Sequence, residues 1–112
     1  MGSGIEPKLT QRKCAPCRSG TAPYRDHEIR AMLAEVPAWN VEGGELVREF
    51  AFADYCEVLA FVNAVAWIAR REDHHPEIRF GYKACRIAYS THSIGGLSEN
   101  DFISAAKVDA LL

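Results

Sequence analysis

Residues 54–71 constrain the fold most, because they have the pattern of one long helix that is apolar on more than one face. Asp54 and Glu57 are spaced as a helix-starting capping box. One stripe at helical spacing comprises Val58, Leu59, Val62, Val65, Ala66 and Ala69, and a second beside it comprises Phe61, Ala64 and Ile68, flanked by Trp67. A helix that covers one sheet needs a single stripe. The surplus predicts a subunit interface, and therefore a homodimer or homotetramer.

The segments on either side of this helix alternate between helical and strand patterns. A helix is expected over residues 26–35, with Asp26 as its N-cap and Pro37 beyond its end. Strands over 39–41 and 46–52 flank the pair Gly43-Gly44, which suits a tight hairpin. Two further strands are expected over 78–82 and 84–91. Ser98 then opens a final helix.

This order of elements predicts an α+β fold. Short hairpins favour antiparallel pairing, so the simplest arrangement is a four-stranded antiparallel sheet with three helices on one face. Residues 1–24 are expected to be a flexible leader carrying the sequence Cys-x-x-Cys, because they are rich in proline and show no helical or strand periodicity. Residues 25–112 would then be one domain, as the length of 112 residues suggests.

Charge and hydropathy exclude several classes of protein. A formal net charge of -2 argues against a nucleic-acid-binding protein. No segment has the ~20 apolar residues of a membrane span, and the first ten residues lack the apolar core of a secretory signal. A cytoplasmic protein without a disulfide framework is therefore expected.

Three of the four histidines are candidates for proton transfer. His74 and His75 lie between a helix end and a strand start, and Pro76 restricts the backbone there. His92 ends a strand expected to pair with the one that follows His75. The three could flank one pocket, where imidazoles serve well as acids and bases near neutral pH. Surface or capping histidines are the competing interpretation.

Other interpretations of the polar residues remain open. Three histidines could hold zinc, but adjacent histidines are awkward ligands for one ion, so no metal is expected. The pair Cys14 and Cys17 has no second pair to complete a structural zinc site, and a redox role would need a thioredoxin-like context. Asp101 could complete the Ser98 capping box, or it could also shape the pocket.

Several spaced motifs together resemble the pterin-4a-carbinolamine dehydratase family, which is also known as the dimerization cofactor of a homeodomain transcription factor. They are Asp73-His74-His75-Pro76-Glu77, Tyr82, Ser90-Thr91-His92, and Gly96-Leu97-Ser98-Glu99 with Asp101. The resemblance covers roughly residues 26–112, and the Cys-x-x-Cys leader is similar to an extension in bacterial members. Ile78 departs from the family, which commonly has an aromatic residue there.

The resemblance implies an enzyme that needs no cofactor. A 4a-hydroxytetrahydropterin made by aromatic amino acid hydroxylases would lose water to give quinonoid dihydropterin, as in tetrahydrobiopterin recycling. By position, His74 and His92 would be the acid and base, in an order left open, and His75 would orient the pterin. Further substrate contacts are expected from Asp73, Pro76, Thr91, Ser93, Ile94 and Asp101.

Two alternatives share this fold. One is a non-catalytic interaction protein, such as a transcriptional coactivator, that binds its partner through the apolar helix 54–71. The other is a pterin-binding relative in molybdopterin metabolism.

Overall fold

A computed structural model describes residues 8–18 and 20–112. Its three α-helices are α1 (Asp26–Leu33), α2 (Tyr55–Glu72) and α3 (Glu99–Asp109), and its four strands are β1 (Asn40–Glu42), β2 (Glu45–Ala51), β3 (Glu77–Phe80) and β4 (Ala84–Tyr89). Two short 3-10 helices, η1 (Leu9–Gln11) and η2 (His92–Ile94), complete the described elements. No helix of the described residues is long and apolar enough to cross a membrane.

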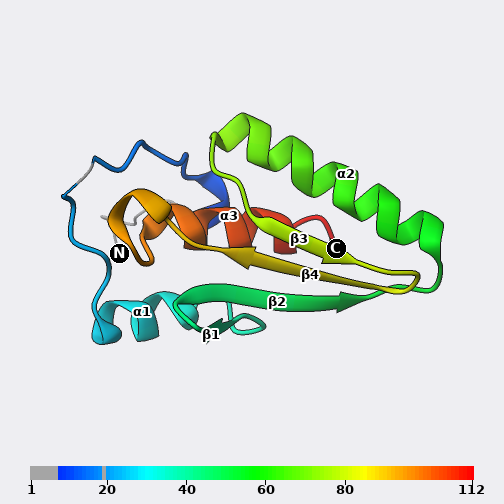
Figure 1. Cartoon of the computed structure of the whole chain (residues 1–112), viewed down its shortest axis with the longest axis horizontal. Coiled ribbons are helices and arrows are strands. Elements are labelled where there is room, and N and C mark those ends of the chain that lie inside the picture. Colours follow the sequence, from blue (N-terminus) through cyan, green and yellow to red (C-terminus); the bar gives the residue numbers. More distant parts are fainter. Residues whose placement is uncertain (1–7, 19) are drawn as a thin grey trace.

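The four strands form one antiparallel sheet in the order β1-β2-β4-β3 (Figure 1). The β1–β2 turn consists of Gly43 and Gly44, whose φ angles of 57° and 78° explain why glycine is needed there. On the core face, Leu46 pairs with Tyr89 and Phe50 pairs with Cys85 across the central strands. The predicted α+β fold is confirmed.

Side chains from all three helices pack on that face. Val58 and Val65 of α2 and Phe102 of α3 are fully buried in the same core cluster as the sheet residues. Ile29, Met32 and Leu33 of α1 pack against its edge. α3 is the most enclosed helix, since every residue from position 100 to position 106 is buried. Its amino end therefore lies inside the molecule, where a polar side chain must find a partner.

Two predicted helix starts differ in detail from the structure. α1 begins at Asp26 as predicted, but its N-cap is Arg25 rather than Asp26, and the Glu28 carboxylate accepts the Arg25 backbone N–H at 2.9 Å. This helix ends at Leu33, two residues short of the predicted end. Asp54 caps α2 as predicted, but the Glu57 carboxylate accepts the backbone N–H of Ala53 instead of that of Asp54.

Candidate active site

His74 is positioned by the way α2 ends. Asp73 adopts a left-handed conformation (φ 51°, ψ 43°), and it is the one non-glycine residue of the described chain with a positive φ. The backbone N–H of His74 donates to Ala69 O at 3.2 Å, which closes the last turn of the helix. This sharp reversal directs the His74 side chain towards the buried start of α3.

Asp101 receives that side chain. Its Oδ1 lies 2.6 Å from His74 Nε2, while its Oδ2 accepts the Thr91 hydroxyl at 2.8 Å and the Ser98 backbone N–H at 3.0 Å. Thr91 Oγ1 in turn accepts the Ser98 hydroxyl at 2.8 Å. Asp101 is completely buried, so these bonds replace the water that a carboxylate otherwise needs. It therefore completes the predicted capping box and also holds a histidine.

This arrangement fixes which nitrogen of His74 carries a proton. An ionised carboxylate can only accept, so Nε2 must be the N–H that donates to Asp101. In the neutral ring, Nδ1 then has the lone pair. Tyr89 stacks on the imidazole with ring centroids 5.8 Å apart and planes within 7°. Ring plane and tautomer are thus both set by neighbouring side chains.

His74 opens onto a cleft of about 410 Å³. The domain contributes the end of α2, the segment around η2 and the start of α3. The leader contributes the remaining wall, from Lys13 to Cys17. The domain residues of the lining are Arg71, Glu72, Asp73, His74, Thr91, Ser93 and Asn100.

The structure brings only part of the predicted site together. Asp73, His74, Thr91 and Ser93 line the cleft, and Asp101 lies behind His74. His75 and His92 are exposed, Pro76 and Ile94 are half-buried, and none of these four is among the lining residues. His92 lies between Thr91 and Ser93 in the chain. The roles predicted for these residues remain predictions.

Sequence reasoning missed most of the cleft lining, and Cys14, Glu72 and Asn100 make the main polar contacts among the missed residues. The Cys14 thiol lies 3.5 Å from Asn100 O and from Ser104 Oγ, and burial raises its pKa to about 11. The Asn100 side chain accepts a hydrogen bond from the Ala15 N–H and donates one to the Ala15 carbonyl. No local pattern signals these contacts, since they join residues more than 50 positions apart. The predicted boundary between a leader and a domain stays a prediction, and residues 1–7 and 19 lie outside the described chain.

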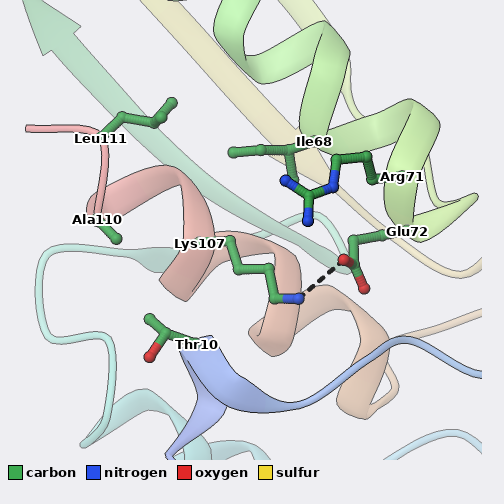
Figure 2. Close-up of a pocket in the computed structure, with 7 residues that line it drawn as sticks. All are labelled: Thr10, Ile68, Arg71, Glu72, Lys107, Ala110 and Leu111. Atoms are coloured by element: carbon green, nitrogen blue, oxygen red, sulfur yellow. Dashed lines mark hydrogen bonds and ion pairs between the residues drawn. The ribbon is translucent and has the colours of Figure 1, made fainter.

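Glu72 connects the cleft to a second cavity of about 260 Å³ (Figure 2). Its Oε2 accepts from Lys107 Nζ at 2.8 Å, and its Oε1 accepts the Cys14 backbone N–H at 2.9 Å. Burial alone would raise the pKa of Glu72. The hydrogen bonds from Lys107 and Cys14, together with the charges of Lys107 and Lys13, outweigh burial and lower this pKa below its usual value. Glu72 is therefore an anion that joins α2, α3 and the leader.

A metal site requires a group of metal-ligating side chains. Among residues 8–18 and 20–112, no three His, Cys, Asp or Glu side chains are grouped so that they could hold a metal ion. Cys14 and Cys17 are free cysteines, and burial raises the pKa of Cys14 to about 11.

Comparison with known proteins decides the family. The family model for pterin 4 alpha carbinolamine dehydratase matches residues 22–111. The chain belongs to this family. A relative from Nitrosospira multiformis is 50% identical over 103 residues, covering 92% of this chain and 91% of its own. One from Dechloromonas aromatica is 49% identical over 104 residues, covering 93% of each. Both are named provisionally as pterin-4-alpha-carbinolamine dehydratases.

Two solved structures of the family share the fold. A transcriptional coactivator/pterin dehydratase from Brucella melitensis superposes with a TM-score of 0.76 at 30% identity, covering 80% of this chain and 97% of that one. A pterin dehydratase-like protein identified as a RuBisCO assembly factor in the α-carboxysome gives a TM-score of 0.54 at 31% identity, covering 65% and 84%. Members of this fold therefore carry names of both catalytic and assembly functions.

Proposed function

We propose that the protein catalyses the dehydration of a 4a-hydroxytetrahydropterin to quinonoid dihydropterin and water. The observation that carries this proposal is the buried Asp101 carboxylate, which holds His74 by a 2.6 Å bond at the wall of a cleft in a member of the dehydratase family. A carboxylate–imidazole pair beside a cavity is an arrangement suited to acid–base catalysis.

The reaction requires two proton transfers. One proton leaves N5 of the pterin, and one is delivered to the departing 4a-hydroxyl group, so that water and a C=N bond form. With Nε2–H donated to Asp101, His74 Nδ1 can take up a proton. The negative charge of Asp101 then stabilises the resulting imidazolium. His74 supplies one half of the chemistry without a metal or redox group.

His92 is the proposed partner for the second transfer. It begins η2 between Thr91 and Ser93, both of which line the cleft, and its exposure leaves the imidazole able to exchange protons with solvent. His75, next to His74, would orient the pterin. Asp73, Thr91 and Ser93 would contact its polar edge, and Pro76 and Ile94 would support the rim.

The proposed setting is tetrahydrobiopterin recycling in the cytoplasm, where an aromatic amino acid hydroxylase would supply the substrate. A related pterin of molybdopterin metabolism is the alternative substrate. The two share the ring system that the cleft would hold, so direct turnover of each is the way to distinguish them.

Dehydration of enzymatically generated 4a-hydroxytetrahydropterin tests the proposal. The rate is followed by the rise in quinonoid dihydropterin absorbance, with and without the protein, in the presence of a metal chelator. Acceleration that survives the chelator is the expected result. Well-folded protein that leaves the spontaneous rate unchanged would refute the dehydratase.

A binding function is the second candidate, and exposed aromatic side chains favour it. Trp67 of α2 is 59% exposed, and Tyr55 contacts Tyr82 at a centroid distance of 5.6 Å on the outside of the molecule. If replacement of Trp67 by lysine abolished binding to a partner while dehydration continued, the two functions would occupy different surfaces.

A further inference from the structure

The leader is attached to the domain through residues 13–17, a segment that we call the strap. The Cys14 N–H donates to Glu72 at 2.9 Å and the Ala15 N–H donates to Asn100 Oδ1 at 3.0 Å. Asn100 Nδ2 donates back to Ala15 O at 2.6 Å. Lys13 Nζ also donates to the carbonyl of Arg71, and the Ser93 hydroxyl donates to that of Cys17.

These bonds satisfy polar groups that are buried in the folded chain, where the strap covers them. Glu72 and Asn100 are each only 8% exposed. If the strap were absent, the Asn100 amide would lose both of its bonds to Ala15, and the Glu72 carboxylate would lose one acceptor contact. The domain surface is therefore complementary to the strap, which is part of the folded structure around the cleft.

The strap also contributes much of the cleft's lining, namely Lys13, Cys14, Ala15, Pro16 and Cys17. We propose that the strap is one wall of the pterin site, so that these leader residues contact the bound substrate and contribute to its affinity. This inference rests on the proposed function, since it assigns the cleft beside His74 to the pterin.

The comparisons show how far the similarity to known relatives reaches into this wall. The family model begins at residue 22, beyond the strap. The match to the Nitrosospira multiformis relative spans 103 residues, more than the segment from 22 to 112 contains, so it extends into the leader. The match to the Brucella melitensis structure includes 80% of this chain and 97% of that chain. The strap thus lies outside the segment that the family model matches but within the segment shared with the Nitrosospira multiformis relative.

Cysteine alkylation tests the wall directly on the unmodified protein. Cys17 lines the cleft, whereas Cys56 is exposed on α2 and is absent from that lining, so Cys56 is an internal control. Cys14 is unsuitable as a reporter, because burial raises its pKa to about 11 and keeps its thiol protonated at pH 8. Oxidised biopterin, which cannot undergo the reaction, is the probe.

At saturating biopterin, iodoacetamide should label Cys17 about tenfold more slowly and Cys56 at an unchanged rate, because a bound ring excludes reagent from the wall. Calorimetry on the same samples reports whether the pterin binds. Binding without protection of Cys17 would overturn the wall while leaving the dehydratase proposal intact. Failure of the pterin to bind would overturn both.

A bulky substitution in the strap gives an independent readout. Ala15 is exposed and lines the cleft, and its anchoring bonds use backbone atoms, so Ala15→Trp fills space without removing an anchor. We expect KM for the pterin to rise about tenfold with a smaller change in kcat. Ala22→Trp, in the leader but outside the cleft lining, is the matched control and should leave KM unchanged. Equal KM values for both variants would contradict the proposal.

Discussion

At the scale of single residues, the most informative contact is the stack of Tyr89 on His74. The Tyr89 hydroxyl is buried and has no hydrogen-bond partner among the described residues, and burial raises the pKa of this phenol, so it stays protonated. Its ring lies parallel to the imidazole. The ring, rather than the hydroxyl, therefore accounts for the positioning of His74.

Replacement of Tyr89 by two different residues separates these features. Tyr89→Phe should keep kcat and leave the free energy of unfolding unchanged or up to about 1 kcal/mol higher, because a buried unpaired hydroxyl is removed. Tyr89→Leu should lower kcat severalfold and destabilise the fold by about 1–3 kcal/mol, because the flat ring beside His74 is lost. Steady-state kinetics measures kcat, and urea unfolding measures the free energy of unfolding. Loss of kcat in Tyr89→Phe as large as in Tyr89→Leu would assign the hydroxyl a role that this structure does not give it.

The lowered pKa of Glu72 predicts how the free energy of unfolding changes at acid pH. Its pKa is lowered in the folded protein, so its stabilising contribution is complete above the usual glutamate pKa of 4.5 and is lost as the pH falls through the folded value. Glu72→Gln should therefore be less stable than the wild type at pH 7, and the difference should shrink below pH ~4.5.

Urea unfolding at a series of pH values between 7 and 3 measures this difference. Glu99→Gln is the control, because Glu99 pairs with Arg12 at the surface and is 48% exposed, where an ion pair contributes little. A difference between wild type and Glu72→Gln that does not change with pH would show that Glu72 acts by packing rather than by charge.

At the scale of elements, the loop after β4 meets the leader at Gly96. A Cβ atom on Gly96 would lie 2.7 Å from Cβ of Pro23, closer than two carbon atoms can approach. On the same side, the Tyr24 N–H donates to Leu97 O at 2.8 Å. Gly96 thus allows the chain entering α1 to pack against the segment that carries Thr91 and Ser98.

Gly96→Ala should destabilise the protein by about 1–3 kcal/mol, because Pro23 must move away from the new methyl group. The expected result is a lower urea midpoint with an unchanged slope. Gly81→Ala is the matched control, since a Cβ there meets no atom within 4 Å and its φ is not positive. Equal stability of the two variants would show that Pro23 can move away from the methyl group without loss of stability.

The elements were largely predictable from the sequence, because their signals are local. The capping residues Asp54 and Ser98 and the Gly43-Gly44 turn marked boundaries within a few residues, as the structure confirms. The N-cap of α1 was wrong by one residue, because Asp is a preferred capping residue and only the contact from Glu28 to the Arg25 N–H indicates the true cap. The strand expected over 84–91 is confirmed as β4 (Ala84–Tyr89), and Cys85, Ile87 and Tyr89 lie in the core.

The site was only partly predictable, because its contacts are long-range. His74 could be singled out from its neighbours in sequence, but the pairing with Asp101 crosses 27 positions and depends on how α2 ends. Asp101 was expected to complete the capping box of α3. Its contact with His74 was not expected, because it depends on the burial of that helix start. The strap's place in the cleft depends on Asn100 and Glu72, two residues with no motif of their own.

At the scale of the whole molecule, the exposed apolar residues predict an oligomer. Trp67 is 59% exposed, Tyr82 is 80% exposed and Leu112 is 66% exposed. Contact with another subunit would remove this apolar surface from water. Light scattering should give a mass of two or four times 12.4 kDa. Trp67→Lys should shift the distribution towards the monomer if α2 carries the contact. A monodisperse wild-type monomer would contradict the prediction.

The central claim is that His74, held by Asp101, performs the proton transfer of dehydration, and His74→Gln tests it most directly. Glutamine can still donate an amide hydrogen to Asp101 but cannot act as a base. The dehydration rate is measured for the wild type, His74→Gln and His27→Gln, where His27 is an exposed histidine of α1 that is absent from the cleft lining. We expect kcat to fall by a factor on the order of 10² or more for His74→Gln alone, with all three proteins equally folded. Wild-type turnover by His74→Gln would contradict this claim.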